Sequence, residues 1–417
     1  MTPPPAQRPP GEHSDIEILR DDGTRAFCRL GGHDGRFAFS PSAADTGQES
    51  REVVERLAHE FALRDHLDGA WSLLPLDFVR TEGKSWLVVE YPGGEWLDRL
   101  LGSPMDLERC LRIAVSLLGA LARLHGSGLI HKDIKPSHVI VSSEAGETRL
   151  TGFGIATLLR RERQWPDPPE VIAGTLAYMS PEQTGRMNRS IDSRSDLYAA
   201  GVILYEMLAG CLPFEAADPM DWVHCHVARQ PIPPSLRRPE VPCALSAIAM
   251  KLLAKTAEAR YQTAAAAQRD LQRCLAEWQA NGRICDFELG QDDVPDHLTI
   301  PEKLYGRERE IRALLDAFDR TLAGGAPELV LVSGYSGIGK SALVNELHKP
   351  LVPPRGLFAS GKFDQYKRDV PYATLAQAFQ SLVRPLLSKS EDALRPWREA
   401  LLDALEPNGA LIVDLVP

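Results

Sequence analysis

The alternation of apolar and polar residues divides the first 275 residues into a strand-rich part and a longer helix-rich part. Short apolar runs at residues 26–30, 36–39 and 86–89 are separated by turns rich in Gly and Asp, which is typical of half-buried strands. Residues 51–67 and 108–125 carry apolar side chains at helical spacing, and Gly126 ends the second run. The pattern predicts a small, mostly antiparallel sheet with one helix, followed by a large helical region.

A second α/β pattern follows. Residues 276–303 are polar and show neither helical nor strand periodicity, so they are predicted to be a linker. A helix to about residue 322, an apolar strand at 328–333, a helix at 342–348, a strand at 356–360 and a helix at 372–383 are then expected. The proline-rich residues 1–14 are expected to be a disordered lead-in.

Length and charge narrow the class of protein. A chain of 417 residues suggests two or three domains. The formal net charge of -10 argues against general binding to nucleic acid. No apolar stretch is long enough for a membrane span, and the N-terminus lacks a secretory pattern. The seven cysteines never occur as C-x-x-C, so a cytoplasmic protein without a disulfide framework is expected.

Two short motifs carry the candidate chemistry of the first region. Residues 131–138 read H-K-D-I-K-P-S-H and residues 151–154 read T-G-F-G. They closely resemble the paired H-R-D-x-x-x-x-N and D-F-G elements of protein kinases. The resemblance implies that Asp133 accepts the proton of a substrate hydroxyl and that Lys135 is typical of the serine/threonine branch.

Several residues depart from that family's pattern. The resemblance places the two magnesium ligands at His138 and Gly152, and neither offers the side-chain oxygen that magnesium requires. The expected glycine loop has one glycine within residues 22–27, and residues 1–83 contain no lysine. Glu60 matches the helix glutamate of the family, but its lysine partner is absent, and Arg36 is a weak substitute.

The architectural residues of the large kinase lobe are present. The resemblance implies that Asp196 braces the catalytic loop and that Glu182 pairs with Arg260. Residues 155–173 contain a single threonine, Thr157, and no serine, so phosphorylation has almost nothing to act on there. The residues that maintain the fold are therefore kept, whereas the metal ligands are lost.

The second region contains a complete phosphate-binding motif. Residues 334–341 read G-Y-S-G-I-G-K-S and satisfy G-x-x-x-x-G-K-[ST], between an expected strand and an expected helix. Backbone amides around Gly334, Gly337 and Gly339 would face the phosphates of ATP, Lys340 would add a positive charge, and Ser341 would bind Mg²⁺. Residues 410–414 resemble the strand of P-loop domains that ends in a magnesium-orienting acid, but an ordinary strand is the preferred interpretation.

The sequence predicts an α+β two-lobed protein-kinase-like fold at residues 15–275, a linker at 276–303, and a partial α/β P-loop NTPase domain at 304–417. The order of domains, with G-R-E-R-E at 306–310, resembles the N-terminal part of bacterial multi-sensor hybrid kinases. Their downstream sensor and histidine-kinase modules are absent from this sequence, so histidine-kinase activity is not expected.

Three functions remain open. The first is a pseudokinase that is coupled to an ATP-binding switch domain and acts on protein partners in a signalling pathway. The second is an active serine/threonine kinase with atypical metal ligands, and the third is a scaffold that binds no nucleotide.

Overall fold

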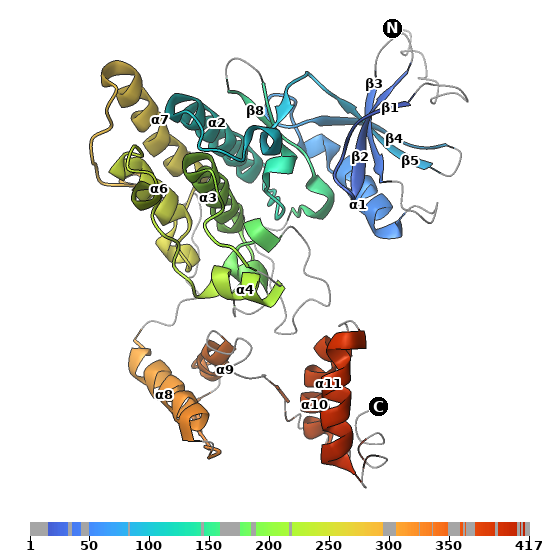
Figure 1. The fold of residues 1–417 in the computed structure, drawn as a ribbon, viewed down its shortest axis with the longest axis vertical. Coiled ribbons are helices and arrows are strands. Elements are labelled where there is room, and N and C mark those ends of the chain that lie inside the picture. The colour runs from blue at the N-terminus through green and yellow to red at the C-terminus, as the bar shows by residue number, and fades with distance from the viewer. Residues whose placement is uncertain are drawn as a thin grey trace.

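The computed structural model describes residues 16–31, 36–42, 50–81, 84–142, 146–158, 176–184, 189–216, 219–294, 306–324, 326–335, 337–348, 359–361, 363, 372–387, 391–406, 409 and 412. Its first part has two lobes, shown at the top of Figure 1. The small lobe is a five-stranded antiparallel sheet with the order β1-β2-β3-β5-β4. Its strands are β1 (Ile16–Asp21), β2 (Arg25–Leu30), β3 (Arg36–Pro41), β4 (Leu74–Thr81) and β5 (Lys84–Glu90).

Helix α1 (Arg51–Ala62) packs against this sheet because Val53 and Leu57 on one of its faces are buried among the apolar strand residues. The expected helix at 51–67 is thus confirmed, except that its last turn is a 3-10 helix at Arg64–His66. Glu60, one turn after Leu57, is only 2% exposed. Burial of a carboxylate requires partners, and these lie in the cleft between the lobes.

The large lobe is built from helices with a small three-stranded sheet at its upper edge. The sheet has the order β6-β7-β8, formed by β6 (Glu95–Trp96), β7 (Val139–Val141) and β8 (Thr148–Leu150). The helices are α2 (Leu107–Gly126), α3 (Ser193–Ala209), α4 (Pro219–Val227), α5 (Pro234–Arg237), α6 (Cys243–Leu252) and α7 (Ala264–Asn281). The apolar faces of α2, α3, α6 and α7 form one continuous core.

The predicted beginning of the linker at residue 276 is wrong. Helix α7 continues to Asn281, where Gly282 caps it with a left-handed backbone. The chain then folds back onto the lobe, because Phe287 and Leu289 pack against the core and Asp293 accepts hydrogen bonds from the amides of Gln262 and Thr263. Polar residues anchored in this way show no periodicity, which is why the pattern indicated a linker.

Helices account for most of the described residues after 305. They are α8 (Glu308–Gly324), α9 (Lys340–Asn345) with a 3-10 turn at Glu346–His348, α10 (Ala373–Leu387) and α11 (Glu391–Leu405). The predicted helices to about residue 322, at 342–348 and at 372–383 are thereby confirmed. The predicted strand at 328–333 is not formed in the described ranges, where these residues are neither helix nor strand, and Leu329 and Leu331 are 85% and 84% exposed. A strand needs neighbours for its backbone hydrogen bonds, and the expected strand at 356–360 lies mostly outside the described residues.

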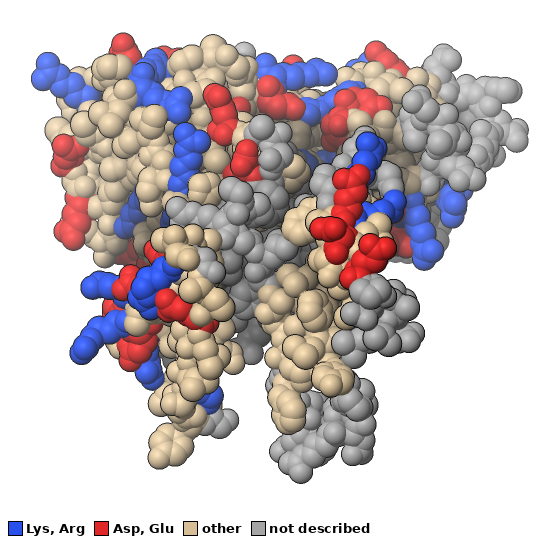
Figure 2. Space-filling model, turned by 60° about the horizontal axis from the view of Figure 1, so that its bottom comes forward, with Lys and Arg blue, Asp and Glu red and all other residues tan. Residues whose placement is uncertain are grey.

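The described helices include none that is both long and apolar enough to cross a bilayer. On the face shown in Figure 2, basic and acidic side chains of the described residues are interspersed. This face therefore presents no large field of one sign.

Candidate functional site

The loop that carries Asp133 is held from below by a buried carboxylate. Asp196, near the beginning of α3, accepts hydrogen bonds from the amides of His131 and Lys132 at 2.9 and 2.8 Å. Burial opposes the ionisation of Asp196, but its hydrogen bond with His125 and the nearby histidines lower its pKa below the ordinary value. Lys132 has a φ of 67°, so the braced loop turns sharply just before Asp133. The predicted bracing role of Asp196 is confirmed.

The structure brings Asp133, Lys135 and His138 together. The Nζ of Lys135 lies 3.1 Å from the Oδ2 of Asp133. The Nδ1 of His138 lies 2.8 Å from the backbone oxygen of Asp133 and therefore donates a hydrogen to it. The predicted catalytic carboxylate thus faces the cleft, with a cation and an imidazole beside it.

His138 fills the space that a side chain at position 152 would need. A Cβ built on Gly152 would lie 2.6 Å from the Cε1 and Nδ1 atoms of His138, and the φ of Gly152 is +84°. Burial, followed by the positive charges of Arg25 and Lys135, lowers the pKa of His138 well below its ordinary value. The imidazole is therefore neutral and packs in the cleft as a space-filling group.

This arrangement does not fit a magnesium ion held as in a working kinase. Magnesium takes hard oxygen ligands in an octahedron. The residue at 152 has no side chain, and the residue at 138 is an imidazole whose Nδ1 is bonded to Asp133. Across the described residues there is no group of three His, Cys, Asp or Glu side chains that could hold a metal.

A cation does pair with Glu60, and the sequence pattern did not indicate it. The Nη1 of Arg25, on β2, lies 3.5 Å from the Oε2 of Glu60, and the guanidinium lies 4.4 Å above the ring of Phe39. The Oε1 of Glu60 accepts a hydrogen bond of 3.0 Å from the amide of Gly152. The expectation that Glu60 lacks a partner is wrong. The family's spacing places that partner on β3, whereas Arg25 lies on β2. The register of β2 and β3 places Arg25 opposite Pro41, two residues from Phe39, and an alignment of this hairpin is the signal that could have indicated it.

The open part of the cleft is a polar hollow of about 380 Å³. The turn between β1 and β2, helix α1 and the loop after Asp133 line it. Three positive side chains, Arg25, Arg56 and Lys135, are balanced there by Asp22, Glu60 and Asp133. Each of the three cations is within ion-pair distance of a carboxylate, so the hollow has no excess positive charge to attract phosphates.

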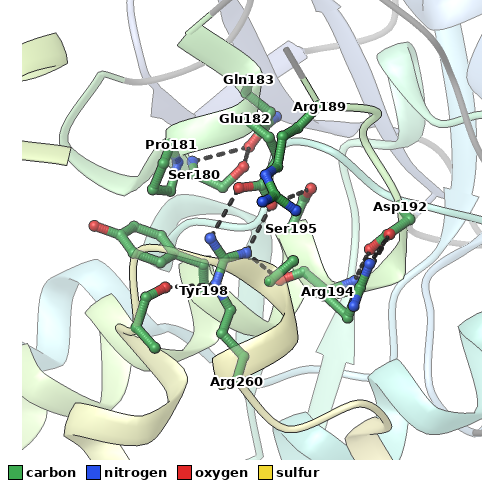
Figure 3. A network of polar contacts seen from close by, with 12 residues as sticks. Ser180, Pro181, Glu182, Gln183, Arg189, Asp192, Arg194, Ser195, Tyr198 and Arg260 are labelled. Carbon is green, nitrogen blue, oxygen red and sulfur yellow. Dashed lines mark hydrogen bonds and ion pairs between the residues drawn. The ribbon is translucent and has the colours of Figure 1, made fainter. Parts of the chain in front are cut away.

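Below the cleft, the predicted pair of Glu182 and Arg260 is confirmed. Figure 3 shows the Arg260 guanidinium directed at both oxygens of the Glu182 carboxylate, with distances of 2.6 and 2.8 Å. Ser195 donates a further hydrogen bond to Glu182 at 2.7 Å, and Arg194 forms its own pair with Asp192. This network joins the segment at 180–184 to α3 and to the turn before α7, and it maintains the lobe without any catalytic group.

The phosphate-binding motif of the second region forms a loop that leads into α9. Gly337 and Gly339 have φ of +80° and +93°, a backbone conformation that favours glycine. The Nζ of Lys340 lies 2.9 and 2.8 Å from the backbone oxygens of Gly334 and Tyr335, so the amine is directed into its own loop. Ser341 is exposed at the first turn of α9. These residues fit the phosphates of a nucleotide, with Ser341 as the side chain that would hold Mg²⁺.

Some predicted features lie outside the described residues. These are the proline-rich lead-in, most of the segment at 155–173, and most of the strand-like run at 410–414. Thr157 is described, and its backbone pairs with Ile130.

Comparison with known proteins gives the class of the chain. The family model of the protein kinase domain matches residues 43–271, more than half of the chain, and that of the AAA ATPase domain matches residues 303–415. The chain belongs to the protein kinase family, and its kinase-like domain is followed by an AAA ATPase domain.

Particular relatives include the hybrid signal transduction histidine kinase G of Dictyostelium discoideum, 28% identical over 75% of this chain and 12% of the relative. The serine/threonine-protein kinase pkn3 of Myxococcus xanthus is 34% identical over 53% of this chain and 42% of the relative. PknB of Mycobacterium tuberculosis is 36% identical over 45% and 30%, respectively. The chain thus spans less than half the length of each of these relatives.

Proposed function

We propose that this chain is an ATP-binding signalling protein whose kinase-like domain is catalytically impaired and whose P-loop is the nucleotide site. The observation that carries the proposal is the contact between His138 and Gly152. One residue without a side chain and one neutral imidazole stand where the transferring phosphate needs its two metal ligands. In a kinase these groups act together, so the loss of both removes the means of neutralising the phosphoryl group.

The phosphate-binding cation is also displaced. Arg25 lies on β2 rather than β3, and its guanidinium is already engaged by Glu60 and by the ring of Phe39. In a working kinase the corresponding lysine holds the nucleotide phosphates while it pairs with the glutamate. A guanidinium held between a carboxylate and an aromatic face is a poor replacement for that mobile point charge.

The P-loop supplies what the kinase-like cleft lacks. Lys340 is directed into a glycine-rich turn, and Ser341 begins the helix that follows. Protein partners in a signalling pathway and a cytoplasmic location are part of the proposal. The seven cysteines are all unpaired, which suits a reducing compartment.

Incubation of the full chain with radiolabelled ATP, magnesium and manganese, and a generic basic protein tests the impairment. We expect wild type to show no more labelling than Asp133→Ala. In a domain that transfers no phosphate, loss of the Asp133 carboxylate changes nothing. Stoichiometric labelling of either protein that disappears in Asp133→Ala would contradict the proposal.

A second candidate is an active serine/threonine kinase with atypical ligands. The close pairing of Asp133 with Lys135 favours it, since this is the arrangement expected to serve a substrate hydroxyl. The same labelling experiment separates the two candidates. An Asp133-dependent signal above background supports the active kinase.

A further inference from the structure

The polar hollow occupies only one end of the cleft between the lobes. Residues Asp22, Thr24 and Arg25 line it, so it lies under the turn between β1 and β2. In a kinase this turn covers the nucleotide phosphates. The base of the same nucleotide must therefore lie farther along β2, toward Phe27 and the segment at 91–95 that joins the lobes.

That end of the cleft is filled by five aromatic side chains, which we name the aromatic plug: Phe27, Phe37, Phe39, Tyr91 and Trp96. Phe27 lies at its centre, with ring centroids 5.7 Å from Phe37, 4.9 Å from Phe39 and 5.1 Å from Tyr91. Phe37 and Tyr91 are 4.7 Å apart. Rings at these separations are in direct contact, and none of the five lines the hollow.

Trp96 connects the plug across the two lobes. It lies on β6, opposite Ile140 of β7, and so belongs to the small sheet of the large lobe. Its ring nevertheless contacts Phe27 and Phe39 of the small lobe, at centroid distances of 5.6 and 6.2 Å. Trp96 is 4% exposed and shares one buried apolar cluster with Phe27, Phe39 and Ile140. The roof and the floor of the cleft therefore meet through protein side chains.

A polar latch closes the edge of the cleft beside the plug. Arg20 on β1 donates two hydrogen bonds to the carboxylate of Asp98 in the large lobe, one of them 2.8 Å long. The same guanidinium lies 4.7 Å from the centre of the Trp96 ring. Arg99 adds a hydrogen bond of 3.2 Å to the backbone oxygen of Leu19. Strand β1 is thus tied to the opposite lobe beside Trp96.

We propose that the kinase-like cleft is closed by its own side chains: the aromatic plug occupies the place of a nucleotide base, and the Arg20–Asp98 latch holds the lobes together without ligand. The domain is then a rigid module that accepts no nucleotide, and the P-loop is the one nucleotide site of the two. The inference goes beyond the proposed function, because an impaired kinase can still bind ATP.

Isothermal titration of the full chain with magnesium-ATP and with adenosine tests the closed cleft. Wild type should bind one equivalent of ATP and no adenosine, and Lys340→Ala should bind neither. Two equivalents of ATP, or any binding of adenosine that protects β2 and residues 91–96 from hydrogen exchange, would overturn the inference. Absence of ATP binding to both proteins would instead contradict the P-loop assignment while supporting the closed cleft.

Hydrogen exchange of the β1 amides tests the latch itself. Arg20→Ala and Asp98→Ala should each accelerate exchange by roughly fivefold, and the double variant should exchange no faster than Arg20→Ala, because Arg20→Ala already removes both the pair with Asp98 and the contact with Trp96. Arg29→Ala is the matched control. Its partner Glu17 lies on the same sheet and both side chains are more than half exposed, so exchange should change by less than about twofold. Equal effects of Arg20→Ala and Arg29→Ala, or additive effects in the double variant, would overturn the latch.

Discussion

At position 152 the backbone and the surroundings impose separate costs on any replacement of glycine. A residue with a Cβ is strained at a φ of +84°, and its Cβ would also meet the His138 ring at 2.6 Å. Gly282 has a similar φ of +61° but open space around it, so Gly282→Ala measures the backbone cost alone. We expect Gly152→Ala to lower the free energy of unfolding by about 2 kcal/mol more than Gly282→Ala does, as urea denaturation would show.

The double variant His138→Ala/Gly152→Ala is the further check on this contact. It should recover most of the excess cost, because the shortened side chain at 138 leaves room for the new methyl group. If the cost of Gly152→Ala is unchanged in that background, the two positions are not complementary.

Restoration of both metal ligands is expected to leave the domain without ordinary kinase activity. The variant Gly152→Asp/His138→Asn regains the carboxylate and the amide, but Arg25 stays bound to Glu60 and the plug still fills the place of the base. Catalytic groups that act as a unit recover little when only some are repaired. Steady-state phosphorylation of a basic protein at about 1 per second or faster would contradict this expectation.

Because three histidines are buried, the free energy of unfolding is expected to depend on pH. Burial lowers the pKa of His131, that of His138 well below the ordinary range, and that of His226 to about 3. In the unfolded chain each binds a proton near pH 6.5, so the unfolded state binds more protons below that pH. Stability is therefore present above about pH 6.5 and falls as the pH decreases, by up to about 1.4 kcal/mol per pH unit for each histidine.

Urea unfolding of His226→Gln at pH 7.5 and 5.5 measures this dependence. The variant should lose less stability between the two values than wild type loses. His66→Gln, at an exposed position, is the control and should retain the wild-type slope. An unchanged slope in His226→Gln would exclude that histidine as a contributor.

At the scale of elements, one buried ion pair connects the segment at 180–184 with α3 and with the turn before α7. Glu182 and Arg260 are both about 2% exposed, and burial opposes the ionisation of Glu182 while Arg260 lowers its pKa overall. Removal of one partner leaves a charge buried without compensation. We expect Glu182→Gln to reduce the free energy of unfolding by about 3 to 5 kcal/mol.

Glu55→Gln is the matched control for this prediction. Glu55 forms an exposed pair with Arg51 on α1, so the same chemical change should cost less than about 1 kcal/mol. Comparable urea midpoints for the two variants would show that the buried network contributes little.

Local patterns predicted strands β2, β3 and β5 and helices α1 and α2, because each has a periodic apolar face. The pairing of Glu182 with Arg260 and the role of Asp196 followed from spacing within known motifs. Arg25, Trp96 and the latch could not be predicted in this way. Their contacts join segments far apart in the chain, and no local period marks a side chain that fills a cleft. The unpaired segment at 328–333 likewise depends on strands elsewhere, which its own apolar pattern does not specify.

At the scale of the whole molecule, nucleotide should act on one domain and leave the other unchanged. Lys340 is the charged group of the P-loop, and its amine is held against loop oxygens that phosphates would displace. Magnesium-ATP at a hundredfold excess over its dissociation constant should stabilise the AAA ATPase domain by about 2.7 kcal/mol. The kinase-like domain, closed by its plug and latch, should unfold at the same temperature with and without nucleotide.

Thermal melts of the full chain with and without magnesium-ATP test this division. Lys340→Ala should remove most of the shift, because it deletes the charge beside the terminal phosphates and keeps the glycine backbone. Lys135→Ala, which alters the kinase-like cleft instead, should preserve it. If the shift survives in Lys340→Ala and is lost in Lys135→Ala, the nucleotide lies in the kinase-like cleft, and the P-loop is not the site that ATP uses.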